Sequence, residues 1–131
     1  MTGERIVIVD DNKELLEELQ ETLGLCGYDA KTVSDGRAAF KLALRFKPDI
    51  ILLDLKMPGS SGFDVAESLK QNKETAGIPI IAMSGYFPID KQGILLEMSN
   101  MDGRIKKPFE ITNLVTEIEN ILNNTGRAAL G

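Results

Sequence analysis

Histidine is absent from the 131 residues of this chain, and cysteine occurs only once. Without an imidazole, the chain cannot form a Ser-His-Asp triad or carry a phospho-histidine of its own. A single cysteine, Cys26, supports neither an intramolecular disulfide nor a cysteine metal cluster. Any chemistry must therefore rest on carboxylates, hydroxyls, lysines and the backbone.

Long apolar runs and basic blocks are also lacking. No apolar stretch approaches the roughly 20 residues of a membrane-spanning helix, and residues 1–5 lead into the first apolar run without a signal-peptide pattern. These absences predict a cytoplasmic protein with no membrane association. The net charge is −5, and nucleic-acid affinity comes mainly from Lys and Arg. We therefore expect no direct contact with nucleic acid.

The length and composition are typical of one soluble domain, with 43% hydrophobic and 27% charged residues. We expect the domain to span residues 1–124. Residues 125–131 are small or polar for the most part and are expected to form a flexible tail.

Short β-branched apolar runs alternate with amphipathic helical patterns along the whole chain. Strands are predicted at 6–9, 28–33, 50–53, 79–83 and around Ile105. Helices are predicted after the caps Asn12 and Ser61, at Ser34-Asp35-Gly36, over about 90–98, and from Ile111, with a loop around Pro58. This alternation predicts an α/β fold with a five-stranded parallel sheet, order 2-1-3-4-5, doubly wound (flavodoxin-like) with five helices.

Acidic residues stand at the ends of two predicted strands. Asp10 and Asp11 close the first strand, and Asp54 closes the third. In the order 2-1-3-4-5 these strands are neighbours, and their carboxyl ends border the crevice in which such sheets bind ligands. Crowded carboxylates raise one another's pKa, and Mg²⁺, a hard cation that prefers oxygen ligands, removes this conflict. Ser84 and Lys107 enter the same crevice from the fourth and fifth strands.

Each of these residues has a plainer interpretation when it is taken alone. Asp10 and Asp11 can be a solvated pair that caps the first helix, and Asp54 can be an acid that caps a turn. Lys107 can be an ordinary surface lysine, and Ser84 a generic strand-end serine. Their convergence on one crevice favours the functional interpretation.

Four segments resemble the motifs of bacterial response-regulator receiver domains. They are Val9-Asp10-Asp11-Asn12, the stretch from Leu52 to Gly62, Met83-Ser84-Gly85 and Lys107-Pro108-Phe109. The segments occur in the order that this family has. The resemblance extends over roughly residues 4–123.

This resemblance implies a two-component signalling switch rather than an enzyme. Asp54 would accept a phosphoryl group from a phospho-histidine of a sensor histidine kinase or a histidine phosphotransfer protein. The metal would be Mg²⁺, for which Mn²⁺ could substitute. Asp11 would ligate it directly and Asp10 mostly through water, and Asp54 and the backbone carbonyl of Lys56 would complete the protein ligands.

The resemblance also assigns roles to the residues around the acceptor. Lys107 would pair with a phosphoryl oxygen, aimed into the crevice by a cis peptide bond before Pro108. Ser84 would donate its hydroxyl to the phosphoryl group, and Gly85 would leave phosphorus accessible. Gly62 would let the backbone enter the third helix tightly.

One position departs from the family pattern. Three residues before the lysine, the family usually carries Tyr or Phe, and this chain has Arg104. The usual aromatic relay is therefore in doubt, although phosphorylation itself does not need it. We expect the surface around Met98, Arg104 and Lys106 to change on phosphorylation and to control a downstream protein partner.

Two other functions remain as alternatives. A Mg²⁺-dependent phosphohydrolase commonly has a second acid two residues after its nucleophile, but this chain has Lys56 there. A docking module with the same fold and no phosphorylation is the second alternative, although all the expected polar residues are present. The chain leaves no space for an output domain, so it is expected to act alone or to be part of a longer protein.

Overall fold

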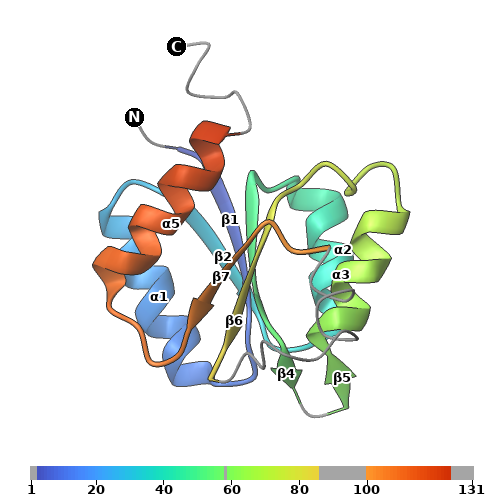
Figure 1. The fold of residues 1–131 in the computed structure, drawn as a ribbon, viewed down its shortest axis with the longest axis horizontal. Helices are drawn as coiled ribbons and strands as arrows, with labels where there is room; N and C mark the ends of the chain where they lie inside the picture. The colour runs from blue at the N-terminus through green and yellow to red at the C-terminus, as the bar shows by residue number, and fades with distance from the viewer. Residues whose placement is uncertain (1–2, 58, 86–99, 125–131) are drawn as a thin grey trace, which may run out of the picture.

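The computed structural model describes residues 3–57, 59–85 and 100–124. Five parallel strands form one sheet in the order β2-β1-β3-β6-β7. They are β1 (Arg5–Val9), β2 (Asp29–Val33), β3 (Ile50–Asp54), β6 (Ile80–Ser84) and β7 (Gly103–Lys106). Since β4 and β5 form a separate hairpin, this arrangement confirms the predicted order 2-1-3-4-5 (Figure 1).

Helices cover both faces of the sheet. Those in the described residues are α1 (Lys13–Leu25), α2 (Gly36–Phe46), α3 (Gly62–Gln71) and α5 (Ile111–Asn124). α1 and α5 lie on one face, and α2 and α3 lie on the other (Figure 1). None of these helices has the length and apolarity to span a membrane. The helix predicted over about 90–98 and the tail predicted over 125–131 lie outside the described residues.

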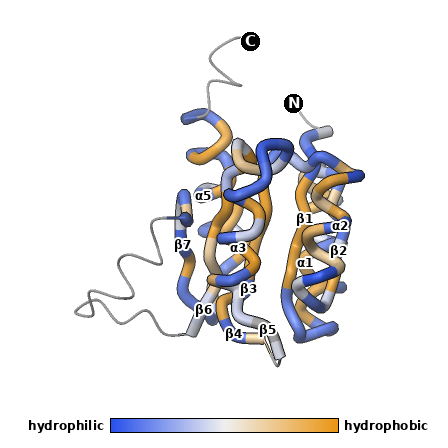
Figure 2. The backbone as a smooth tube through the Cα atoms, turned by 90° about the vertical axis from the view of Figure 1, so that its right-hand side faces the viewer, coloured by the Kyte–Doolittle hydropathy of each residue, from blue (hydrophilic) through white to orange (hydrophobic). Residues whose placement is uncertain are grey.

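The central strands are apolar because both of their faces are covered by helices. Successive side chains of a strand point to opposite faces. Ile6 and Ile8 of β1 therefore join the core under α1 and α5, and Val7 and Val9 join the core under α2 and α3. Figure 2 shows the strands β1, β3 and β6 as largely hydrophobic segments within the molecule.

The two predicted helix caps, Asn12 and Ser61, are confirmed, and Asp35 is the cap within the predicted start of the second helix. The side chain of Asn12 accepts a hydrogen bond from the backbone N–H of Leu15 at 3.1 Å. Asp35 accepts from the N–H of Ala38 at 2.9 Å, and Ser61 caps α3 in the same way. Each cap satisfies an N–H group that the first turn of its helix leaves unpaired.

The stretch between β3 and α3 differs from the predicted loop. It forms a small antiparallel hairpin of β4 (Lys56–Met57) and β5 (Ser60–Ser61). Strands of two residues are too short to show a period-two pattern, so the hairpin could not be predicted from the residues. The tight entry into α3 is confirmed, because a Cβ on Gly62 would collide with the carbonyl oxygen of Asp54.

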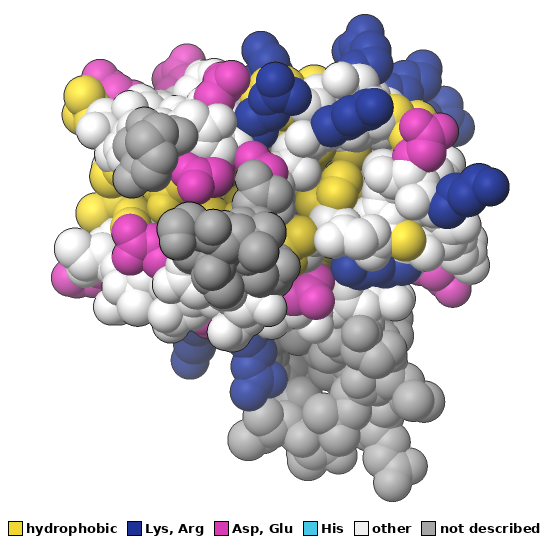
Figure 3. Space-filling view, turned by 90° about the horizontal axis from the view of Figure 1, so that it is seen from above, with side chains coloured by type: hydrophobic (Ala, Val, Ile, Leu, Met, Phe, Trp, Pro, Cys, Tyr) yellow, Lys and Arg dark blue, Asp and Glu magenta, His cyan; other side chains and the backbone are white. Residues whose placement is uncertain are grey.

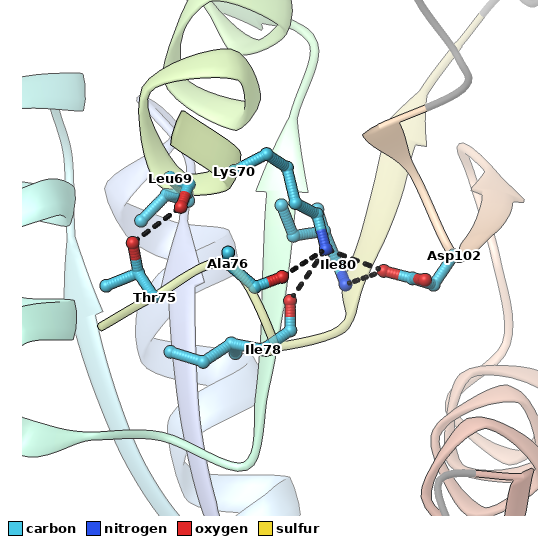
Figure 4. Close-up of polar contacts among 7 residues, drawn as sticks. All are labelled: Leu69, Lys70, Thr75, Ala76, Ile78, Ile80 and Asp102. Carbon is cyan, nitrogen blue, oxygen red and sulfur yellow. Dashed lines mark hydrogen bonds and ion pairs between the residues drawn. The ribbon is translucent and has the colours of Figure 1, made fainter. Parts of the chain in front are cut away.

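A polar network joins α3 to the beginnings of β6 and β7. The ammonium of Lys70 donates to the carbonyls of Ala76 and Ile78 at 3.3 and 3.1 Å, and pairs with Asp102 at 3.3 Å. The same Asp102 carboxylate oxygen accepts from the N–H of Ile80 at 2.8 Å. We call this network the Lys70–Asp102 clamp (Figure 4). It lies at the end of the sheet where the strands begin, and the predicted acidic site lies at the other end.

Candidate functional site

Three carboxylates meet at the carboxyl edge of the sheet. Asp10 and Asp11 follow β1, and Asp54 is the last residue of the neighbouring strand β3. Each contributes one carboxylate oxygen to a group in which all the oxygens lie within 4.8 Å of one another. Asp10 and Asp54 are buried, and Asp11 is exposed. The structure therefore brings together the three acids that the sequence places at two separate strand ends.

Lys107 follows β7 and points into this cluster. Its ammonium lies 2.6 Å from a carboxylate oxygen of Asp10 and 3.6 Å from one of Asp54. The peptide bond between Lys107 and Pro108 is cis, as predicted. The short contact to Asp10 was not foreseen, because the sequence does not say which of several acids a lysine 97 residues away will contact.

Backbone N–H groups hold two of the carboxylates in place. The N–H of Asn12 donates to Oδ1 of Asp10 at 2.9 Å. The N–H of Lys56 donates to Oδ1 of Asp54 at 3.3 Å. Both bonds span two residues, the arrangement in which an Asp side chain binds the backbone of its own turn. The plainer interpretation of Asp54 as a turn cap is thus correct, and it is compatible with a ligand site. Asp10 is buried rather than solvated, and the side chain that caps α1 is that of Asn12.

Burial raises the pKa of Asp54 above its ordinary value. The negative charge of Asp10 raises this pKa further, and Asp11 contributes in the same direction. The charge of Lys107 and the hydrogen bond from the N–H of Lys56 act against the rise. An Asp54 carboxylate that is only 4% exposed therefore lies among more negative than positive charge.

The donor set suits a small hard cation. An octahedral Mg²⁺ has oxygen ligands at about 2.1 Å, which places neighbouring ligand oxygens about 3 Å apart and opposite ones about 4 Å apart. Three carboxylate oxygens within 4.8 Å of one another fit this geometry after a small contraction. Among the described residues this is the group of carboxylates close enough to hold a metal ion. One lysine balances only part of their charge.

Ser84 and Gly85 border the acids on the other side. Ser84 ends β6, next to β3, and is 4% exposed. Its carbonyl accepts from the N–H of Lys107 at 2.7 Å, which ties the two strand ends together. A Cβ on Gly85 would meet no atom within 4 Å, so packing of the described residues does not require a glycine there.

Arg104 lies on β7 and is exposed. Lys106, two residues on, is also exposed and shares this side of the strand. Met98, the third member of the predicted output surface, lies outside the described residues.

A doubly wound sheet with this acidic edge and an adjacent lysine defines a class of domain whose ligand site lies at the carboxyl ends of its strands. Residues 6–119 match the sequence model of the response regulator receiver domain, and the chain belongs to that family. It is a receiver domain of the kind found in two-component systems.

The chain is similar to the receiver-containing part of longer regulators. It is 35% identical over 126 residues to the phosphate regulon transcriptional regulatory protein PhoB of Pseudomonas aeruginosa, covering 96% of this chain and 55% of that protein. It is 34% identical over 116 residues to the DNA-binding response regulator MtrA of Mycolicibacterium paratuberculosis, covering 88% and 49%. The chain thus spans about half the length of these relatives.

Solved structures agree with this family. The chemotaxis response regulator CheY4 of Vibrio cholerae has a TM-score of 0.83 and 24% identity, covering 92% of this chain and 99% of that one, and supports the fold. The response regulator TrrA of Thermotoga maritima, solved in complex with Mg²⁺ and BeF, has a TM-score of 0.79 and 29% identity, covering 90% and 98%.

Proposed function

We propose that Asp54 accepts a phosphoryl group in a Mg²⁺-dependent reaction and that phosphorylation switches the domain. The observation that carries this proposal is the position of Asp54. Its carboxylate is almost fully buried, shares a group of oxygens with Asp10 and Asp11, and lies 3.6 Å from the ammonium of Lys107.

In the proposed step, an oxygen of Asp54 forms a bond to phosphorus. The bond between phosphorus and an imidazole nitrogen of the donor histidine breaks, and the imidazole leaves with the electron pair. The nucleophile must be ionised to react. The pKa of Asp54 is raised because the protein stabilises the negative charge of this carboxylate less well than water does. A bound cation, or a covalent bond to phosphorus, would relieve this unfavourable charge.

Asp10, Asp11 and Asp54 would hold Mg²⁺, with the backbone carbonyl of Lys56 as a further ligand. The ion supplies positive charge that offsets the charge developing on the phosphoryl oxygens. Lys107 now pairs with Asp10 at 2.6 Å, and its 3.6 Å distance to Asp54 leaves it able to bind an oxygen of a phosphoryl group on that residue.

Ser84 is the proposed hydroxyl donor to the phosphoryl group. It is buried at the end of β6, the strand that pairs with β3, so its place in the fold is beside the acceptor. The same β6 pairs with β7, which carries Arg104 and Lys106. A movement of Ser84 toward a phosphoryl group would therefore alter the strand on which the proposed output surface lies.

The phosphoryl donor is a phospho-histidine on a kinase or phosphotransfer protein, and the chain has no histidine to take its place. A cavity of about 480 Å³ between α1 and residues 107–111 borders Lys107, with Leu15, Leu19 and Phe109 in its lining. This apolar surface beside the acceptor suits a protein donor. We further propose a cytoplasmic receiver domain over residues 1–124 that acts on a protein target, with residues 125–131 as a flexible tail.

The test is phosphorylation of Asp54→Asn by acetyl phosphate or by a candidate histidine kinase with Mg²⁺. We expect one phosphoryl group on the unaltered chain and none on Asp54→Asn, measured by intact mass. Asp64→Asn, which changes an exposed acid in the first turn of α3, is the matched control and should be labelled normally.

Other results would identify the alternatives. Labelling of Asp54→Asn at the normal level would contradict the choice of acceptor. Rapid multiple turnover of the phosphodonor would indicate a phosphohydrolase. Absence of labelling by several kinases and small donors alike would indicate a docking module without phosphorylation.

A further inference from the structure

All the charge on α2 is basic and lies in one stripe. Arg37, Lys41 and Arg45 are the charged residues of this helix, and each is exposed. Their spacing of four residues places them on one side of the helix, over about 12 Å of its length. No ion pair or hydrogen bond joins any of the three to another residue in the described part of the chain. We call these residues the α2 stripe.

Two other basic side chains near α2 are already engaged. Arg5 and Lys31 lie over the ring of Phe46 at 5.3 and 5.2 Å from its centre, and Arg5 also donates to the carbonyl of that residue. These two cations stabilise the end of α2 against the sheet. The α2 stripe has no such structural use, so its charge is available to a ligand.

The stripe is unusual in a chain of net charge −5. α1, on the opposite face of the sheet, has four exposed acids and one exposed lysine. Figure 3 looks onto the end of the molecule where the strands begin. Lys and Arg side chains gather over the half that carries α2 and α3, and most acidic side chains lie over the half that carries α1 and α5. The charge is thus divided between two faces.

A groove runs beside the stripe, between α2 and α3. It has a volume of about 410 Å³, and Arg37 and Lys41 form part of its wall. Phe40 and Val65 supply an apolar lining, and Asp64 is also part of it. Arg45 lies beyond the groove, one turn further along α2. The basic stripe is therefore longer than the groove, which indicates a ligand that extends along the helix rather than a small anion inside the groove.

We propose that the α2–α3 groove binds an acidic amphipathic helix of a partner protein. Acids at four-residue spacing on such a helix would face the α2 stripe, and apolar side chains beside them would enter the groove against Phe40 and Val65. This combination of an apolar anchor and a charged border is how an amphipathic helix binds in a groove. The groove lies between the N-terminal halves of α2 and α3, and neither Lys107 nor any acid of the cluster lines it. Binding of the helix is therefore proposed for the unphosphorylated chain.

The surface favours a protein helix over nucleic acid or an anionic membrane. Asp64 in the groove would repel any anion beside it, so the acids of the partner helix must lie along the α2 stripe and a hydrogen-bond donor of the partner must face Asp64. Three cations along about 12 Å are few for a duplex, whose specific partners usually neutralise many phosphates. An apolar groove with a charged rim has the anatomy of a protein interface.

The probe is a 14-residue helical peptide with Glu at four-residue spacing beside a stripe of Leu, titrated into the isotope-labelled chain without phosphorylation. We expect saturable amide shifts on α2 and α3. Lys41→Glu should weaken binding about tenfold, because it turns attraction into repulsion at the middle of the stripe. Lys13→Glu makes the same change of charge at an exposed position on α1 and should alter the affinity less than about twofold.

Two further arms make the outcome decisive. A peptide with Gln in place of Glu should bind more weakly, and higher salt should weaken the Glu peptide, because exposed charges are screened. Equal effects of Lys41→Glu and Lys13→Glu, equal binding of the Gln peptide, or shifts outside α2 and α3 would overturn the proposal. So would tighter, Lys41-dependent binding of a DNA duplex or of phosphatidylserine vesicles.

Discussion

Two lysine–aspartate contacts lie at opposite ends of the sheet, and they differ in their balance of charge. At the end where the strands begin, Lys70 and Asp102 form one pair, and backbone groups take up their remaining hydrogen bonds. At the carboxyl end, Lys107 stands against a cluster of three carboxylates, of which Asp10 and Asp54 are buried.

The difference separates a structural use of charge from a functional one. A balanced, fully hydrogen-bonded pair contributes to stability without needing a ligand. An unbalanced buried cluster costs stability until a cation or another partner supplies the missing positive charge. The clamp therefore holds two strands and a helix together, whereas the acid cluster has an excess of negative charge that a cation would balance.

The largest expected effect is that of removing Lys107. Lys107→Met should slow phosphorylation by acetyl phosphate about 100-fold. The variant lacks the positive charge that would stabilise the phosphoryl oxygens in the transition state. Lys70→Met removes the same type of charge at the other end of the sheet and should leave the rate within about twofold. Initial rates of labelling measure both. Similar rates for the two variants would contradict the assignment of a functional role to Lys107 and a structural role to Lys70.

The second effect is stabilisation by Mg²⁺. At 100 times its Kd, Mg²⁺ should raise the free energy of unfolding by about 2.7 kcal/mol. Asp11→Asn, at the exposed acid of the cluster, should lose most of this increase. Asp102→Asn should keep it, since the clamp takes no part in binding. Thermal unfolding with Mg²⁺ and with a chelator gives the comparison, and a loss of the Mg²⁺ effect in Asp102→Asn would contradict it.

The third effect is the contribution of the clamp to stability. Asp102→Ala should lower the free energy of unfolding by about 1–2 kcal/mol. Most of this loss comes from the unpaired N–H of Ile80 and the uncompensated Lys70, since Asp102 is 43% exposed and solvent screens its ion pair. Urea unfolding measures the change, with Asp64→Ala as a control for loss of an exposed acid. Equal stability of the two variants would mean that the clamp is redundant.

The sequence predicted those parts of the structure that depend on local patterns. Apolar runs fixed the central strands, and Asn12, Asp35 and Ser61 marked the starts of three helices. The strand order followed from the alternation of strands and helices, and this order places Asp10 and Asp54 at the same edge of the sheet.

Pairings between distant residues could not be predicted in the same way. Lys70 and Asp102 are 32 residues apart, and Lys107 and Asp10 are 97 apart. Neither pair belongs to a periodic pattern, and each depends on how two distant segments of the chain are placed by the finished fold. The β4–β5 hairpin was missed because two residues per strand carry no periodicity.

The smallest effect is the change in Tm when one aspartate is replaced by asparagine, and its sign should differ between the two ends of the sheet. Because the folded protein holds the pKa of Asp54 above its ordinary value, the folded state binds more protons than the unfolded state between the two pKa values. Without metal, the free energy of unfolding should therefore fall as the pH rises through this window.

Asp54→Asn should remove this contribution and raise the Tm of the metal-free protein by a few degrees at neutral pH. The same exchange at the balanced pair, Asp102→Asn, should lower the Tm, because it weakens a satisfied ion pair. Thermal unfolding of both variants across pH in a chelating buffer measures the two signs. A lower Tm for Asp54→Asn would mean that Lys107 already neutralises the cluster, and the distinction between a balanced and an unbalanced end would then be lost.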